Sequence, residues 1–147
     1  PCQSSAASDV YKRQIYGSPK YLEKHGFPKN TSDLNKHSFI SFGRGAPSPV
    51  YNPDWALKLG TKDNKKRKTV MKVNSVYGLL LAVQSGVGLA ALPDYITVNQ
   101  PNIVKVLPNI EGPITEAHFV YPQSMKNVAR VQAFRNFLYS KISEWEF

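Results

Sequence analysis

The sequence contains a single cysteine, Cys2, among its 147 residues, so it cannot form an internal disulfide bond. Long apolar runs are also absent, because the longest uncharged stretch, Val73–Pro93, contains an asparagine, a glutamine, two serines and several glycines. A membrane-spanning helix needs about 20 mostly apolar residues, and no segment has the layout of a secretory signal. We therefore expect a protein of the reducing cytoplasm with no membrane partner.

The residue patterns of common enzyme sites are missing as well. The histidines are His25, His37 and His118, and their spacing matches no metal-binding motif. No Gly-x-Ser-x-Gly motif occurs, and the Gly86-x-Gly88-x-x-Ala91 pattern leads from a predicted helix into a strand, the reverse of a dinucleotide site. We predict that the chain is not an enzyme and has no metal or cofactor, and that His37 is a packed residue.

The composition is that of a globular protein, with 41% hydrophobic and 20% charged residues. The length suits one domain or a piece of a larger one. The net charge is +9, which favours anionic partners. Much of the positive charge lies in Lys62–Lys68 and Lys72, without apolar periodicity or aromatic residues. We interpret this run as the solvated tip of a hairpin, and contact with nucleic acid is the alternative.

Residues 1–14 differ in composition from the rest of the chain. They are small and polar without a hydrophobic period, and the tract Ser8–Gln14 resembles translated adapter sequence. We predict a non-native or disordered leader, so that the fold begins near Ile15. In that case, an N-terminal portion of the protein is missing.

Several helices and strands are indicated by their boundary residues. Ser18 and Pro19 begin a predicted helix over 19–25 that Gly26 ends. Thr31 or Ser32 can cap a further turn. Alternation and turn residues then predict strands at 38–42, 55–59 and 69–73, with the last pairing with 55–59 or continuing the sheet.

A strand–helix–strand unit follows. Val73 ends a strand, Asn74 and Ser75 form a capping pair, and apolar residues recur at helical spacing up to Ser85. The apolar run Val87–Leu92 then has the length of a buried strand. This order predicts a parallel sheet with helices on its faces. A short helix from Asp94, strands at 103–108 and 117–122, and an amphipathic helix over about 127–143 complete the chain.

Six motifs in order resemble the effector-binding domain of LysR-type transcriptional regulators. They are Ser18–Gly26, Asp33-Leu34 with His37 and Ile40, Ala82–Pro93, Val106–Pro108, Val120–Pro122 and Ala133–Leu138. The resemblance covers the chain from about Ile15 to its end. It implies an α/β fold of the periplasmic-binding-protein type (type II), a mixed sheet with flanking helices.

The resemblance also implies a domain organisation. Residues 15–117 would form the second effector-binding subdomain, and residues 118–147 the crossover strand and C-terminal helix of the first. DNA would be bound only through a helix-turn-helix outside this sequence, and the full-length protein would be a homo-oligomer. A transporter's solute-binding protein is the alternative. A helix-turn-helix encoded upstream in the intact gene would favour the regulator, and a signal peptide there would favour the transporter.

A ligand site is predicted where strands end and a helix begins. In open α/β sheets, ligands bind beyond the carboxyl ends of the strands, near the free N–H groups of helix N-termini. The junction after Val73 and the end of strand 38–42 are such places. We expect a small anionic or polar metabolite there. The candidate residues are Phe42, Gly43, Arg44, Asn74, Ser75, Val76 and Tyr77. Arg44 offers a fork for a carboxylate, although an exposed loop position for Arg44 and a purely capping role for Ser75 stay open.

Overall fold

The computed structural model describes residues 2–43, 52, 54–62 and 65–144. The chain divides into two compact units. One unit consists of residues 12–114, and the other of residues 1–11 with 115–147.

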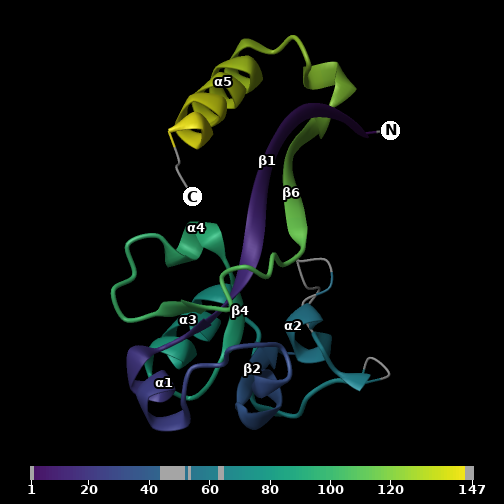
Figure 1. The fold of residues 1–147 in the computed structure, drawn as a ribbon. Helices are drawn as coiled ribbons and strands as arrows, with labels where there is room; N and C mark the ends of the chain where they lie inside the picture. The colour runs from purple at the N-terminus through teal and green to yellow at the C-terminus, as the bar shows by residue number, and fades with distance from the viewer. Residues whose placement is uncertain (1, 44–51, 53, 63–64, 145–147) are drawn as a thin grey trace. The chain divides into compact units, whose positions relative to one another are not determined.

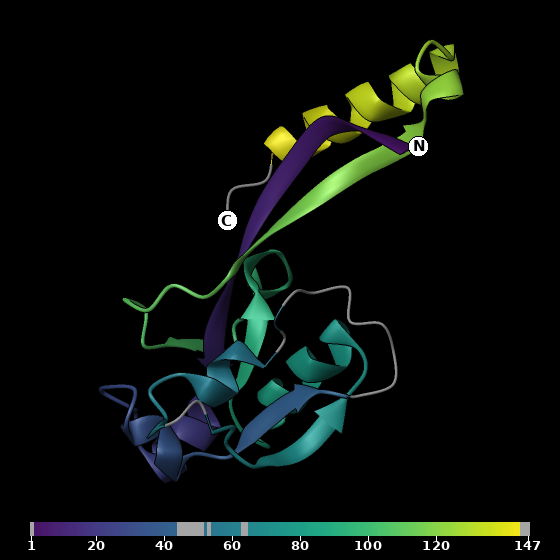
Figure 2. The same ribbon diagram turned by 90° about the vertical axis from the view of Figure 1, so that its right-hand side faces the viewer.

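The larger unit is built on strands that come from distant parts of the chain. In β1 (Cys2–Gly17), the last five residues lie between β4 (Ala90–Pro93) and β5 (Val104–Val106), antiparallel to both. β2 (Phe39–Phe42) pairs in parallel with β3 (Thr69–Val73), as Figure 2 shows. A parallel bridge between Phe39 and Leu89 connects the two groups of strands. The result is the mixed sheet that the sequence predicts.

Side chains that alternate along these strands fill two cores, one on each face of the sheet. Ile15, Phe39 and Leu89 belong to one core, while the next residues in each strand, Tyr16, Ile40 and Ala90, belong to the other. All six are less than a tenth exposed. This period of two places the sheet between two layers of helices.

Helices cover both faces (Figure 1). On the first face lie α1 (Pro19–His25), the 3-10 turn η1 (Asp33–Lys36) and α2 (Trp55–Lys58), with Tyr21, Leu34 and Leu57 in the core. On the second face, α3 (Val76–Gln84) contributes Leu79, Leu80 and Val83. The short α4 (Asp94–Thr97) follows β4 directly.

Local capping explains where α1 begins and ends. The hydroxyl of Ser18 accepts a hydrogen bond from the Tyr21 amide at 3.3 Å, and Pro19 occupies the first helical position. Gly26 ends the helix with a φ of 85°, a conformation that glycine adopts without strain. The predicted helix over 19–25 is thereby confirmed. The cap of η1 differs from the prediction, since the Asp33 amide donates to the side chain of Asn30.

The smaller unit contains β1 up to Tyr11, β6 (Ile114–Pro122) from Thr115 onward, the 3-10 turn η3 (Gln123–Met125) and α5 (Ala129–Ser143). β6 pairs with β1. The rings of Phe119 on β6 and Phe134 on α5 meet edge to face with centroids 5.8 Å apart. The predicted C-terminal strand and helix are therefore present, but no residue of α5 is buried.

The N-terminal residues form a strand rather than the irregular leader that the sequence predicts. β1 begins at Cys2, and Arg13 and Gln14 lie opposite Pro93 and Leu92 and are buried. Ladder hydrogen bonds join backbone groups. A segment without hydrophobic alternation can therefore form an interior strand of a sheet, and its composition gives no sign of this.

The segment 55–59, predicted as a strand, is helical. The Leu59 amide donates to the Trp55 carbonyl at 3.1 Å, and the three residues Trp55, Ala56 and Leu57 are all buried. Apolar alternation over five residues cannot separate one helical turn from a short strand. The predicted hairpin is wrong as well, because β3 pairs with β2 and not with this segment.

Arg67 is not part of a solvated tip. Its guanidinium donates to the side chain of Asn35 at 2.8 Å and to the carbonyls of Thr31 and Ala56, both at 3.1 Å. The same group lies 5.7 Å from the ring centroid of Phe39. Partial burial lowers the pKa of Arg67 below its ordinary value. This side chain therefore joins α2 and the loop around η1 to the start of β3.

We expect Arg67→Ala to destabilise the fold by about 2–3 kcal/mol, because several hydrogen bonds to a charged donor are lost and the carbonyls keep no partner. Arg67→Lys should recover little, since an ammonium cannot reproduce the planar fork. The neighbouring Lys68→Ala is the control, with an expected effect within about 0.5 kcal/mol. Urea denaturation measures all three, and equal midpoints for the Arg67 and Lys68 variants would contradict this role.

α5 exposes large aromatic side chains that should promote association. Phe134 and Phe137 are 52% and 55% exposed, whereas Leu138 is half-buried. We expect concentration-dependent association in sedimentation velocity that Phe137→Ser weakens. Phe27, which is 58% exposed on the larger unit, provides the control Phe27→Ser, which should leave association unchanged. A chain that stays monomeric at all concentrations would refute the expectation.

Candidate functional site

The helix start at α3 is defined by Ser75. Its hydroxyl accepts a hydrogen bond from the Gly78 amide at 3.3 Å, while its carbonyl accepts from Leu79 at 3.0 Å. The first amides of a helix have no acceptor within the helix. Since the Ser75 hydroxyl takes only the Gly78 amide, the amides of Val76 and Tyr77 are left for another acceptor. The capping role that the sequence indicated for Ser75 is present.

The end of β2 lies directly beside this helix start. Phe42 is in register with Val73, and the Gly43 amide donates to the Val73 carbonyl at 2.7 Å. Because the two strands are parallel, their carboxyl ends meet at one edge of the sheet. The structure therefore brings together Phe42, Gly43 and the segment 74–77, which are far apart in the sequence.

The predicted site residues differ in their solvent exposure and in whether they line a hollow. Phe42 and Val76 line a hollow at this edge of the sheet. Asn74 and Ser75 are exposed and do not line it, and the Tyr77 side chain is 61% exposed. Arg44 lies outside the described residues. Within the segment 74–77, the backbone amides at the helix start, rather than the side chains, are thus the groups that could bind an anion.

The hollow has a mostly apolar lining, and most of its residues were not predicted as site residues. Its lining residues beyond Phe42 and Val76 are Arg13, Phe39, Ile40, Ser41, Ala56, Leu57, Leu79, Ala91 and Pro93. The sequence could have predicted the contribution of β4, because the apolar run up to Leu92 is also a parallel strand that ends at this edge. No pattern in the sequence indicates that α2 contributes to the hollow. Arg13 reaches the hollow from β1, and its guanidinium donates to the Asn52 carbonyl at 3.2 Å.

A second, more polar hollow borders the other side of the same strand end. Its lining residues are Ser41, Phe42, Asp54, Leu57, Lys66, Arg67, Thr69 and Lys72. Lys66 forms an ion pair with Asp54 at 2.5 Å, whereas Lys72 has no carboxylate partner among the described residues. Lys66 and Lys72, from the run that the sequence predicts as a solvated hairpin tip, therefore line the same hollow as Phe42. They raise the positive potential at the predicted site.

The histidines form no catalytic or metal-binding arrangement in the described part of the chain, where no group of three metal-ligating side chains occurs. His37 is 9% exposed, and its ring lies 5.8 Å from that of Tyr21. Burial lowers the pKa of His37, and the nearby His25 lowers it further. His37 is thus a packed residue that favours the neutral form. No helix among the described residues is long and apolar enough to cross a membrane.

Comparison with known proteins identifies relatives of this chain. The sequence model of the LysR substrate binding domain matches residues 11–142, a range that begins inside the predicted leader. A curated relative from Haemophilus influenzae, named an uncharacterized HTH-type transcriptional regulator, is 31% identical over 109 residues. That alignment covers 71% of this chain and 36% of the relative. The chain thus spans about a third of the relative's length.

Solved structures share the fold. The regulatory domain of CrgA, a LysR-type transcriptional regulator from Neisseria meningitidis, has a TM-score of 0.72 at 21% identity, covering 97% of this chain and 68% of that one. The regulatory domain of AphB from Vibrio vulnificus has a TM-score of 0.67 at 16% identity, covering 95% and 69%. Full-length AphB from Vibrio cholerae has a TM-score of 0.67 at 17% identity, covering 100% and 48%.

These likenesses agree with the α/β, periplasmic-binding-protein-like fold that the sequence predicts. The curated relative and the CrgA and AphB structures are transcriptional regulators, not enzymes. The family match includes β2, β3 and α3, which carry the candidate site. Since it spans far more than half of the sequence, the chain belongs to the LysR substrate binding domain family.

Proposed function

We propose that this chain is the effector-binding part of a LysR-type, DNA-binding transcriptional regulator. In this proposal, a small metabolite with an anionic or polar head binds at the edge where β2 ends and α3 begins. The observation that carries it is the 2.7 Å hydrogen bond from Gly43 to Val73, which holds the two segments side by side. The family membership and the regulator relatives support this function over the transporter alternative.

The chemistry of the edge suits an anionic head group. The amides of Val76 and Tyr77 stand at the positive end of the α3 dipole, and such ends favour negative charge. Lys72 lies close by, in the polar hollow that also includes Phe42. Arg44, which follows Gly43 in the sequence, would supply a bidentate partner. The site residues are therefore Phe42, Gly43, Arg44 and the segment 74–77.

The apolar hollow is small, about 30 Å³, and suits a short aliphatic group of the ligand. Phe42, Val76 and Leu79 line it together with residues of β4 and α2. Small-molecule sites commonly combine an apolar lining with a few polar groups that fix orientation. A short aliphatic carboxylate has this combination of an apolar body and a charged head, and it is the ligand class that we propose.

The remaining proposals concern the whole protein. Residues 15–117 form the second effector-binding subdomain, and residues 118–147 form the crossover strand and C-terminal helix of the first. The regulator binds DNA through a helix-turn-helix outside this sequence, forms a homo-oligomer and acts in the cytoplasm. The non-native leader is restricted to residues 1–10 in this proposal, because the family match begins at residue 11.

Two substitutions of Val76 distinguish the contribution of its backbone amide to ligand binding from that of its side chain. Val76→Pro removes the N–H at the first helical position, where proline is well tolerated, and Ser75 already has the extended φ of −134° and ψ of 135° that precede proline. Val76→Ala removes side-chain atoms but keeps the N–H. We expect the proline variant to bind the tightest carboxylate of a thermal-shift panel roughly 10–100-fold more weakly than the alanine variant.

Isothermal titration calorimetry measures this difference in the two variants, and circular dichroism confirms that α3 remains helical. Equal affinities for the proline and alanine variants would show that the Val76 amide does not contact the ligand. The anion site at the α3 start would then be wrong.

A second pair of variants tests Arg44. Arg44→Ala should weaken binding of the same carboxylate several-fold to a hundredfold, because a charge-assisted pair contributes roughly 1–3 kcal/mol. Lys65→Ala removes the same charge at an exposed position that does not line either hollow beside Phe42. Lys66 is unsuitable as a control because of its ion pair with Asp54. Equal losses in calorimetry would mean that only net charge matters and would refute a positioned contact.

A further inference from the structure

The segment 62–72 contains six basic residues and one acidic residue, and so carries +5 of the chain's net charge of +9. Two of the basic side chains have structural partners, since Arg67 donates to Asn35 and to backbone carbonyls and Lys66 pairs with Asp54. The other four, Lys62, Lys65, Lys68 and Lys72, are exposed. None of them has a carboxylate partner among the residues that the structure describes.

These lysines border open, polar surface. Lys62 and Lys65 line a hollow together with Lys66, Thr61 and Ser32, and no acidic residue in the described part of the chain lines it. Lys66 also lines the hollow that contains Lys72. The two hollows therefore form one basic surface that extends from the loop before β3 to the end of that strand.

Other roles of lysine do not account for this surface. β3 is bonded only to β2 among the described strands, and charges on an edge strand prevent pairing with other chains. That role explains Lys72 on β3 and Lys68 beside it. It does not explain Lys62 and Lys65, which lie outside the strand. General solubility requires net charge but not the concentration of one sign in eleven consecutive residues.

We propose that this basic surface binds the phosphate backbone of double-helical DNA without reading its sequence. Lysine ammonium groups are compact charges on flexible stems, which suit phosphate contacts. Base reading by arginine is not available, because the N–H groups of Arg67 donate to Asn35 and to carbonyls. Single strands are bound by stacking on aromatic side chains, and the segment contains none. A duplex therefore fits this surface better than a single strand.

The proposal goes beyond the proposed function and rests on it, since the parent regulator would place DNA within reach. Contacts from this surface would add sequence-independent affinity to that of the DNA-binding domain. An acidic protein surface and free phosphate are the competing partners, and competition experiments distinguish them from duplex DNA.

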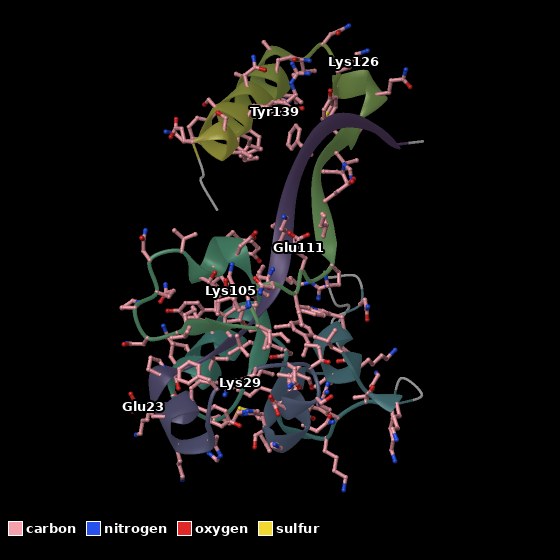
Figure 3. The ribbon with its side chains drawn as sticks, in the orientation of Figure 1. Glu23, Lys29, Lys105, Glu111, Lys126 and Tyr139 are labelled. Atoms are coloured by element: carbon pink, nitrogen blue, oxygen red, sulfur yellow. The ribbon has the colours of Figure 1, made fainter. Side chains whose placement is uncertain are left out.

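The test uses the whole chain and fluorescence anisotropy of a labelled DNA duplex of arbitrary sequence at low ionic strength. The variant Lys62→Gln/Lys65→Gln/Lys68→Gln is compared with Lys24→Gln/Lys29→Gln/Lys105→Gln, which removes the same charge from exposed positions elsewhere on the larger unit. Lys29 and Lys105 of the control are labelled in Figure 3. The slope of log affinity against log salt should fall by about 2–3 in the first variant and remain near that of the wild type in the control.

Three outcomes would overturn the proposal. Equal losses in both triple variants would indicate net charge alone. Competition by polyglutamate that matches or exceeds that of unlabelled duplex at equal charge concentration would indicate an acidic protein partner. Displacement by inorganic phosphate beyond that of sodium chloride at the same ionic strength would indicate a small-anion site. The Val76 variants keep every lysine, so a failure of the effector site would leave this result unchanged.

Discussion

The position of β2, hydrogen-bonded along both edges, determines where the rest of the larger unit can lie. On one edge, β2 is in register with β3 and the Gly43 amide donates to Val73. On the other edge, the Ile40 amide donates to the Leu89 carbonyl at 2.8 Å. Because the neighbours on both edges run parallel to β2, three strand ends meet at one edge of the sheet. The α3 start follows β3 by two residues and so stands at that same edge.

The two cores maintain this register. Phe39 packs in one core and Ile40 in the other. A shift of β2 by one residue along its neighbours would move each side chain to the opposite face of the sheet, where it would not fit the core. The loop with Arg67 acts from outside, by bonding α2 and the η1 loop to the start of β3. The candidate site is therefore built on rigid elements, with the α3 start held by its Ser75 cap and Gly43 held by its bond to Val73. Such preorganisation is what a selective small-molecule site requires.

Much of this arrangement follows from local sequence signals, and the errors have physical causes. Capping residues are readable, because Ser18 and Ser75 satisfy amides only a few residues away. The meeting of β2 with the α3 start follows from the strand–helix–strand order, although the individual ligand contacts stay a prediction. The helical turn at Trp55 was missed because tertiary burial, not periodicity, decides so short a segment. The bonds of Arg67 depend on Thr31 and Asn35, which are remote in the sequence, so the local charge pattern suggested only a solvated lysine-rich loop.

The central claim is that an anionic ligand binds where β2 ends and α3 begins. Its most direct test is a titration of the isotope-labelled chain with butyrate, followed by amide chemical shifts in ¹⁵N–¹H spectra. The account predicts saturable shifts concentrated at Gly43, Val76 and Tyr77, with smaller changes along β4. Saturable shifts instead at residues 29–31, 107, 109 and 110, which line a separate hollow, with Gly43 and Val76 unmoved, would contradict it.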